Sequence, residues 1–255
     1  MDSNESLVNY LCSQRLINQP AVRLAFFKVD RGQYAPKDAY DDKPQVLSHQ
    51  STISAPSMHA KAVELLLPYV LPNVSRQDIE GEGPVIGVHG RKRRILDIGS
   101  GSGFLVDIFS ELAGETGVVV GLEHIEELRN LGEANMRKSE RSAALLDSNR
   151  VCFRLGDGRE GLSGSNRVDG SPPDNDDGWD AIHVGAAAIQ LHDELVEQLR
   201  SPGRLFIPLT EEEGNWFSDQ YIWTVDKDEN GKITKTKRYP ARYVSLMDAR
   251  DVICV

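Results

Sequence analysis

The chain is poor in cysteine, in positive charge and in long apolar runs. Its 255 residues include three cysteines, far apart and without a CxxC pair, so neither a disulfide framework nor a zinc site is predicted. The net charge of −10 argues against binding to bulk nucleic acid or to an anionic membrane. No apolar run reaches membrane-spanning length, and the acidic N-terminus lacks the apolar core of a signal peptide. These absences together predict a cytoplasmic protein in a reducing compartment.

Two common kinds of catalytic site are also missing. The six histidines show no spacing typical of a ligand cluster, so no metal is predicted, although His59 and His183 fall where a pocket is expected. The G-x-S-x-G motif that positions the nucleophile of many hydrolases does not occur. A glycine-rich stretch in the middle of the chain is therefore the main clue to function.

This central stretch reads Asp97-Ile-Gly99-Ser100-Gly101-Ser-Gly103-Phe104 and joins a short apolar strand to the start of a helix. A glycine turn before a helix N-terminus lets backbone approach a nucleotide-sized ligand closely. The dinucleotide fingerprint G-x-G-x-x-G fails because Phe104 occupies its third glycine position, which weighs against a nicotinamide oxidoreductase. The pattern D-x-G-x-G-x-G instead resembles the first motif of S-adenosylmethionine-dependent methyltransferases. A glycine-rich connection in another α/β protein remains the alternative.

Strand and helix patterns alternate around this stretch. Strands are predicted at residues 95–98, 117–123, 150–155, 179–184 and 204–208, and helices at 3–16, 22–29, 56–68 (with Pro68 ending or kinking it), 104–112, 125–139 and 191–199. A hairpin at 220–236 and a last strand at 242–247 are predicted to be antiparallel. The result is a Rossmann-like α/β fold: a mostly parallel sheet with an antiparallel C-terminal edge, helices on both faces and an N-terminal helical extension.

We expect one domain over residues 1–255. Its predicted parts are an N-terminal helical and substrate-loop portion (1–72), a cofactor-binding core (94–209) and C-terminal antiparallel strands (210–255). The polar segments 73–93 and 163–178 are predicted to be flexible insertions.

Three acidic residues follow predicted strands, at the sheet edge where ligands of such folds bind. Glu123 is placed to accept hydrogen bonds from ribose hydroxyls, although a carboxylate there can also cap a helix. Asp157, followed by Gly158, is placed to bind the adenine amino group, and the alternative is a simple Asp-Gly turn. Asp97 completes the set.

Five segments closely resemble the protein-L-isoaspartate O-methyltransferase family and stand in that family's order. They are Val29-Asp-Arg-Gly-Gln-Tyr-Ala-Pro36, Ser51-Thr-Ile-Ser-Ala-Pro-Ser-Met-His-Ala60, Leu96-Asp-Ile-Gly-Ser-Gly-Ser-Gly103, Gly156-Asp-Gly-Arg159 and Asp180-Ala-Ile-His-Val-Gly-Ala-Ala187. The second and fifth are specific to that family among methyltransferases. The resemblance implies methyl transfer from S-adenosylmethionine, which leaves S-adenosylhomocysteine, to the free carboxylate of isoaspartyl or D-aspartyl residues in damaged proteins.

The resemblance also implies residue roles. Ser54 corresponds to the active-site serine. The implied cofactor contacts are Ser51, Thr52, Ile53, Ser54, His59, Asp97, Gly99, Ser100, Gly101, Gly103, Glu123, His124, Asp157, Gly158 and Met247. The implied substrate contacts are Ser54, Ala55, Val184, Gly185, Ala186, Arg242, Tyr243 and Val244. The implied partners are isoaspartyl proteins and peptides, with no nucleic acid and no membrane, and a monomer is expected.

The chain departs from the family pattern at a few positions. Ser57 replaces a histidine, Ser245 a proline, and Met247 a threonine that is often present, so Met247 lacks the hydroxyl for its expected contact. Two alternatives therefore stay open: a methyltransferase with another acceptor, and a noncatalytic cofactor-binding adaptor.

Overall fold

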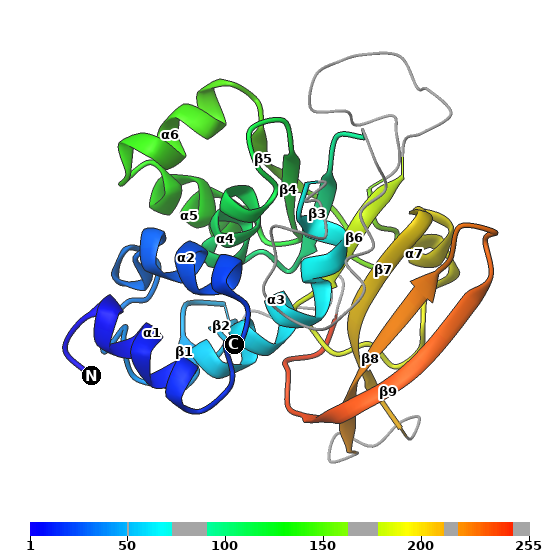
Figure 1. Ribbon diagram of the computed structural model, residues 1–255, viewed down its shortest axis with the longest axis horizontal. Coiled ribbons are helices and arrows are strands. Elements are labelled where there is room, and N and C mark those ends of the chain that lie inside the picture. Colours follow the sequence, from blue (N-terminus) through cyan, green and yellow to red (C-terminus); the bar gives the residue numbers. More distant parts are fainter. Residues whose placement is uncertain (50, 73–90, 163–177, 212–218, 247–255) are drawn as a thin grey trace.

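The computed structural model describes residues 1–49, 51–72, 91–162, 178–211 and 219–246. Its centre is a seven-stranded sheet in the order β5-β4-β3-β6-β7-β8-β9 (Figure 1). The strands are β3 (Arg94–Ile98), β4 (Val118–Glu123), β5 (Val151–Leu155), β6 (Trp179–Val184), β7 (Leu199–Thr210), β8 (Gln220–Lys227) and β9 (Ile233–Ala241). The first five in spatial order run parallel, whereas β8 and β9 are antiparallel. The predicted sheet with its antiparallel edge is thus confirmed.

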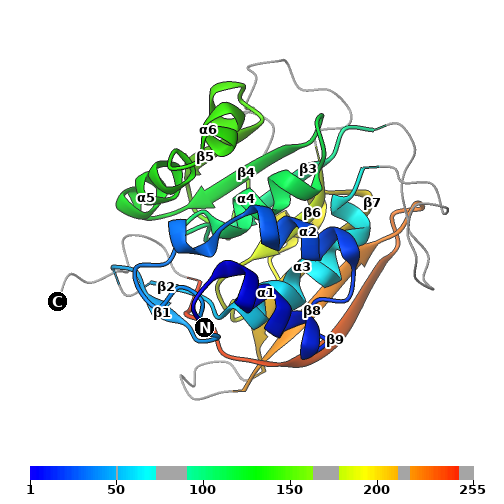
Figure 2. The ribbon, with the colours of Figure 1, turned by 60° about the vertical axis from the view of Figure 1, so that its left-hand side comes forward.

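Helices lie on both faces of the sheet, and most of them lie on one face (Figures 1 and 2). The helices are α1 (Asn4–Ser13), α2 (Pro20–Lys28), α3 (Pro56–Val70), α4 (Phe104–Leu112), α5 (Glu126–Met136), α6 (Glu140–Asp147) and α7 (Asp193–Glu197). Residues of α1 to α6 share one apolar core with Ile95 and Phe206, while Leu195 of α7 joins the core of the opposite face. Side chains alternate between faces along each strand, so Asp97, between Leu96 and Ile98 of the second core, points to the face of α1 to α6.

The N-terminal extension includes a short antiparallel ribbon of two strands, each two residues long. After a short 3-10 helix (Arg31–Gln33), strand β1 (Gln45–Val46) pairs antiparallel with β2 (Thr52–Ile53). Pro56 at the start of α3 fits the first helical turn because its missing N–H has no partner to lose there. The ribbon and this helix start position Ser54 between them.

The structure differs from the predicted local structure at three places and decides between two predicted outcomes at a fourth. Helix α6, capped by the Ser139 side chain, was not predicted. The residue range 191–199 forms only the short α7, and β7 begins at Leu199 because this residue pairs with Trp179. The helix predicted to end or kink at Pro68 is α3, and it does not end there but continues to Val70. Residues 242–246 form no regular strand, since the pairing there is an isolated bridge between Ser245 and Ala187.

Some predictions concern residues outside the described part. These are the insertion residues 73–90 and 163–177, and the contact of Met247. Among the described residues, no helix combines the length and the apolar character that crossing a bilayer would require.

Candidate functional site

The carboxyl ends of β3, β4 and β6 meet the glycine turn beside Ser54. Two adjoining cavities lie there, with about 360 and 480 Å³ of empty space. They share Thr52, Gly99 and Gly185 in their walls. The site therefore has the position that ligand sites occupy in open parallel sheets.

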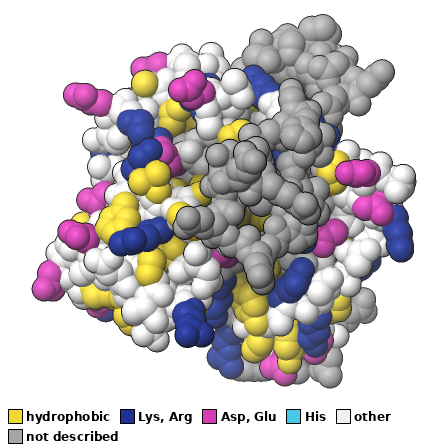
Figure 3. Space-filling model, in the orientation of Figure 1, with side chains coloured by type: hydrophobic (Ala, Val, Ile, Leu, Met, Phe, Trp, Pro, Cys, Tyr) yellow, Lys and Arg dark blue, Asp and Glu magenta, His cyan; other side chains and the backbone are white. Residues whose placement is uncertain are grey.

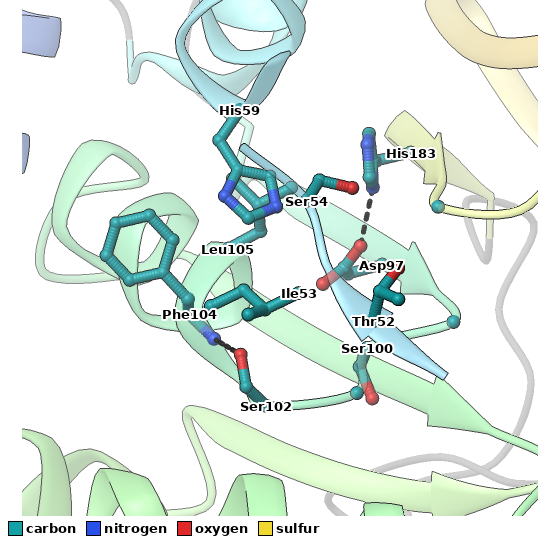
Figure 4. Close-up of a pocket in the computed structure, with 13 residues that line it drawn as sticks. Thr52, Ile53, Ser54, His59, Asp97, Ser100, Ser102, Phe104, Leu105 and His183 are labelled. Carbon is teal, nitrogen blue, oxygen red and sulfur yellow. Dashed lines mark hydrogen bonds and ion pairs between the residues drawn. The ribbon is translucent and has the colours of Figure 1, made fainter. Parts of the chain in front are cut away.

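The first cavity is drawn in Figure 4 and is the more polar of the two. Its lining residues are Thr52, Ile53, Ser54, His59, Asp97, Gly99, Ser100, Gly101, Ser102, Phe104, Leu105, His183 and Gly185. The second cavity is lined by Ser51, Thr52, Ile98, Gly99, Leu122, Glu123, His124, Gly156, Gly158, Gly185, Ala186, Val244, Ser245 and Leu246. Most of the residues predicted from the sequence are thus brought together.

Some predicted site residues do not line either cavity. Ala55, Gly103, Val184 and Tyr243 stand next to lining residues in sequence, and Arg242 stands two positions before Val244, but none of the five contributes to the walls. The Asp157 carboxylate accepts hydrogen bonds from the Arg159 guanidinium at 2.5 and 3.0 Å, so it forms an ion pair with a residue two positions later in the chain. Binding of the adenine amino group by Asp157 stays a prediction, and it requires this ion pair to leave an oxygen available.

Glu123 is a buried carboxylate that organises the turn. One oxygen accepts from the backbone N–H of Gly101 at 2.9 Å. The other accepts from the N–H groups of His124 at 2.9 Å and Ile125 at 3.3 Å. A carboxylate offers about four acceptor sites. Nδ1 of His124 also lies 3.0 Å from Oε1, so these contacts occupy most of the acceptor sites of the carboxylate. Its place in the wall of the second cavity supports the predicted contact with ribose hydroxyls, which stays a prediction.

Asp97 and His183 form a buried pair in the first cavity. They are partners in the register of β3 and β6, and Nδ1 of His183 lies 2.6 Å from Oδ1 of Asp97 (Figure 4). Burial raises the pKa of the Asp97 carboxyl, and the hydrogen bond and charge of His183 oppose that rise. The aromatic ring of Phe206, the β7 partner of His183, stacks on the imidazole with centroids 5.1 Å apart.

Arg31 supports the Ser54 segment from behind. Its fully buried guanidinium donates to the Ser54 carbonyl at 2.7 Å, and another nitrogen lies 3.2 Å from Nδ1 of His59. Burial lowers the pKa of Arg31 to about 10, and Asp42 opposes this, so the group remains a cation near neutral pH. Burial, with the nearby charges of Arg31 and His183, holds the pKa of His59 well below its ordinary value, which keeps this ring neutral.

The Ser54 hydroxyl is left available for a ligand. Among the described residues it has no hydrogen-bond partner, while its carbonyl is held by Arg31. In Figure 4 it points toward the side of the cavity where His183 and Asp97 lie. The arrangement can orient a bound group, and no base next to the hydroxyl is needed for that.

The cavities fit S-adenosylmethionine by several observations. Within the part of the chain that the structure describes, the Ser100 hydroxyl and Nε2 of His183 are buried without a hydrogen-bond partner. A Cβ atom on Gly185 would lie 3.2 Å from the Gly99 carbonyl oxygen and 3.3 Å from that of Ile98, so glycine avoids a tight contact in this shared wall. The acid Glu123 at one end and the helix N-terminus of α4 at the other match a ligand with a ribose and a charged amino-acid part.

Two functional features escaped the sequence analysis. The pairing of Asp97 with His183 depends on strand register across 86 positions, which no local pattern shows. Arg31 belongs to a segment quoted for its resemblance, but nothing in its spacing indicates a contact with Ser54. Among the described residues, no three His, Cys, Asp or Glu side chains gather closely enough to hold a metal ion.

Comparisons with known proteins identify the family of the chain. Residues 2–81 and 88–251 match the family described as protein-L-isoaspartate(D-aspartate) O-methyltransferase. A protein-L-isoaspartate O-methyltransferase of Triticum aestivum is 34% identical over 248 residues, which cover 96% of this chain and 92% of that protein. One from Caenorhabditis elegans is 33% identical over 244 residues, with the same shares of 96% and 92%.

The fold agrees as well. A crystal structure of a protein described as a protein-L-isoaspartate O-methyltransferase from Plasmodium falciparum, in complex with S-adenosyl-L-homocysteine, matches with a TM-score of 0.76 at 28% identity. The match covers 97% of this chain and 99% of that one. Because sequence and fold both match over nearly the whole length, the resemblance seen in the motifs is confirmed, and the chain belongs to the protein-L-isoaspartate O-methyltransferase family of S-adenosylmethionine-dependent enzymes.

Proposed function

We propose that this protein transfers the methyl group of S-adenosylmethionine to the free carboxylate of isoaspartyl, and also D-aspartyl, residues in damaged proteins. The observation that carries the proposal is the position of Ser54. Its hydroxyl faces a cavity that also contains Asp97 and the glycine turn, where a cofactor and an acceptor carboxylate can meet. The methyl ester so formed closes to a succinimide without the enzyme, which starts the repair.

The reaction asks for positioning more than for acid or base catalysis. The bound cofactor supplies a methyl group on a positively charged sulfur. An acceptor carboxylate is already ionised near neutral pH. Its oxygen forms the bond to the methyl carbon, the carbon–sulfur bond breaks with its electrons going to sulfur, and no proton moves. The protein must hold oxygen, carbon and sulfur in line at short distance.

Ser54 is the residue that we assign to this positioning. Its hydroxyl can donate a hydrogen bond to one acceptor oxygen and so aim the other. Arg31 fixes the Ser54 carbonyl at 2.7 Å, which limits the freedom of the segment. The side-chain-free backbone at Gly185, with Ala186 beside it, leaves room for the peptide on the opposite wall.

The C-terminal segment lies next to that wall. The Ala187 N–H donates to the Val244 carbonyl at 2.7 Å, and the Leu246 N–H donates to the Ala187 carbonyl at 2.7 Å. These bonds bring Val244 and Leu246 to the second cavity, although no regular strand forms. We assign substrate contacts to the exposed side chains of Arg242 and Val244, which flank this segment.

We further propose a monomeric, cytoplasmic protein whose partners are isoaspartyl proteins and peptides rather than nucleic acid or membrane. The net charge of −10 supports the absence of nucleic acid and anionic membrane among its partners. On the face drawn in Figure 3, Lys and Arg side chains are interspersed with acidic and hydrophobic ones instead of forming one basic field. Such a surface offers little attraction to a phosphate backbone.

The first test uses two peptides that differ only in one aspartyl linkage, normal or iso, with methyl-labelled S-adenosylmethionine. Base-labile label on the iso peptide alone is expected. Label on neither peptide, with cofactor binding intact, contradicts the proposal and favours another acceptor or an adaptor role. Label on both contradicts the assigned selectivity.

The second test is Ser54→Ala. The expected loss in kcat/KM is at least about tenfold, which corresponds to about 1.4 kcal/mol of transition-state stabilisation. Ser13→Ala, in α1 and outside both cavities, is the matched control and should leave kcat/KM unchanged. A smaller loss at Ser54 would show that its hydroxyl does not orient the acceptor.

A further inference from the structure

The turn between β8 and β9 contains the one Asn-Gly pair of the chain, Asn230-Gly231. The five residues 228–232 that form the tip of this hairpin are all exposed, and none of them lines either cavity. Within the described part of the chain, the side-chain amide of Asn230 has no hydrogen-bond partner. The hairpin tip therefore presents an unrestrained amide to water.

Gly231 leaves this amide open to attack by the protein's own backbone. The backbone nitrogen of the residue after an asparagine lies close to the side-chain carbonyl carbon, and a side chain on that residue hinders its approach. Glycine has none, and no described atom lies within 4 Å of the place that a Cβ would take at Gly231. The pair Asp157-Gly158 differs, because a Cβ at Gly158 would overlap the side chain of Ile98. Neither the sequence nor the fold shields Asn230 in this way.

The hydrogen bonds of the turn oppose the attack only weakly. The Gly231 N–H donates to the Asp228 carbonyl at 3.0 Å, and the Asp228 N–H donates to the Lys232 carbonyl at 3.0 Å. Only the first of these bonds must open before the Gly231 nitrogen can react. Opening one such bond slows the reaction by about 2- to 13-fold. The hairpin tip should therefore react nearly as fast as an unstructured peptide of the same sequence.

We propose that Asn230 converts to an isoaspartyl residue, which a second copy of this chain then methylates. The Gly231 nitrogen loses its proton and forms a bond to Cγ of Asn230, the bond from Cγ to the amide nitrogen breaks, and ammonia leaves. Water then adds to the α-carbonyl carbon of the resulting succinimide and breaks its bond to the Gly231 nitrogen, which regains a proton. The product has a free α-carboxylate, and its main chain runs through Cγ. Methylation of that carboxylate rests on the proposed function.

The position of the tip in the fold requires a second copy. At the open end of the hairpin, the Tyr243 N–H donates to the Gln220 side chain at 2.6 Å, and the following residue, Val244, lines the second cavity. Asn230 lies beyond the opposite end of β8, whose eight residues span roughly 24 Å. In Figure 1 the turn between β8 and β9 lies at the right, away from the β1–β2 ribbon. The tip therefore cannot reach the site of its own chain.

The conversion itself prepares the tip for binding. An isoaspartyl residue adds one carbon to the main chain, so the N–H and carbonyl groups that Asp228 and Lys232 pair across the turn no longer match. The tip then becomes a loose, exposed segment that the site of another copy can admit. Since the tip is remote from both cavities, a damaged copy keeps its own site intact.

The experiment ages wild-type protein and two variants at mildly alkaline pH. Asn230→Gln keeps an exposed amide but would have to close a larger ring, so it removes the reactive site. Asn149→Gln, at an exposed asparagine that no glycine follows, is the matched control. Trypsin cleaves after lysine and releases residues 228–232 as one peptide, which chromatography compares with synthetic aspartyl and isoaspartyl standards. Separate samples of the aged proteins receive fresh wild-type protein and methyl-labelled S-adenosylmethionine, and the label is counted after quenching in acid.

The expected result is isoaspartate in residues 228–232, formed no more than about 13-fold more slowly than in a synthetic peptide of that sequence. Label should enter aged wild type and Asn149→Gln, and most of it should be lost in Asn230→Gln. Without fresh protein, the label per molecule should form more slowly on dilution, since two copies must meet. No isoaspartate in residues 228–232, equal label in Asn230→Gln, or a rate unchanged by dilution overturns the inference.

A synthetic isoaspartyl peptide, treated in parallel, separates the two proposals. If fresh wild-type protein methylates this peptide but not the aged protein, the inference fails and the proposed function stands. If it methylates neither, the proposed function fails, whereas the peptide map still shows whether Asn230 has become isoaspartate.

Discussion

Gly103→Ala should destabilise this protein more than the same change at Gly231, although both glycines have nearly the same backbone conformation. Their φ angles are +83° and +80°, in the left-handed region that costs an L-residue roughly 1–2 kcal/mol. That cost, and the lower entropy of alanine in the unfolded chain, apply equally to both positions. The comparison therefore isolates what a Cβ atom meets in the folded protein.

The surroundings of the two sites differ sharply. A Cβ at Gly103 would lie 2.9 Å from the Gly132 carbonyl oxygen and 3.1 Å from the Phe153 ring, and the first of these is backbone that cannot swing aside. At Gly231 nothing lies within 4 Å. Overpacking of this kind costs about 1–3 kcal/mol. We expect Gly103→Ala to lose about 2–5 kcal/mol and Gly231→Ala about 1–2 kcal/mol.

Urea unfolding of both variants and of wild type gives the difference directly from the midpoints, provided that the slopes agree. A gap of at least about 1 kcal/mol between the variants is expected. Equal losses would refute the argument, because they would mean that α4 and α5 move apart without cost. Gly103 would then be required by its backbone angle alone.

Two further changes test the buried charges. The fully buried Asp180 carboxylate contacts the guanidinium groups of Arg91, Arg93 and Arg200, so Asp180→Asn should lower the free energy of unfolding in urea by about 3–5 kcal/mol. The control is Asp226→Asn, at a half-buried partner of Arg204, with an expected loss of about 1 kcal/mol or less. A loss at Asp180 no larger than that of the control would contradict this prediction. Because the pKa of His59 is lowered by folding, the unfolded chain binds a proton below pH 6.5 at a ring that stays neutral in the folded chain. The free energy of unfolding without cofactor should therefore fall as pH decreases from 6.5 to 5.5, with a limiting slope of about 1.4 kcal/mol per pH unit. His59→Gln should remove that part of the slope, and an unchanged slope would show that the folded ring takes up the proton.

The parallel core of the fold could be predicted because its signals are local. Apolar runs ending at Ile98, Glu123 and Val184, each followed by turn or helix signals, mark strands whose carboxyl ends meet. Asp97 and Glu123 were expected at that edge for the same reason, and both line the cavities.

The errors arose where tertiary contacts decide. Leu191, Leu195 and Leu199 have helical spacing, yet Leu199 enters β7 because Trp179 is available as its pairing partner. Ser139 was counted as the end of one helix, although its side chain caps the next one by accepting from the Ser142 N–H. The spacing of apolar residues does not tell helix from strand at Leu199 or one helix from two at Ser139, because tertiary packing outweighs the small differences in helix propensity.

The two buried carboxylates of the site are satisfied in different ways, and the difference follows from the fold. Glu123 ends its strand just before a helix, so three backbone N–H groups donate to it, and Nδ1 of His124 lies 3.0 Å from the same carboxylate. Asp97 lies inside its strand, where neighbouring backbone groups are already used in the sheet, and it needs a side chain from the next strand. His183 occupies the paired position and supplies that partner. The carboxylate that ends β4 is thus held mainly by backbone of the adjoining turns, whereas the carboxylate inside β3 is held by a side chain of β6. Glu123 and His183 therefore lie in the walls of different cavities, which share Thr52, Gly99 and Gly185.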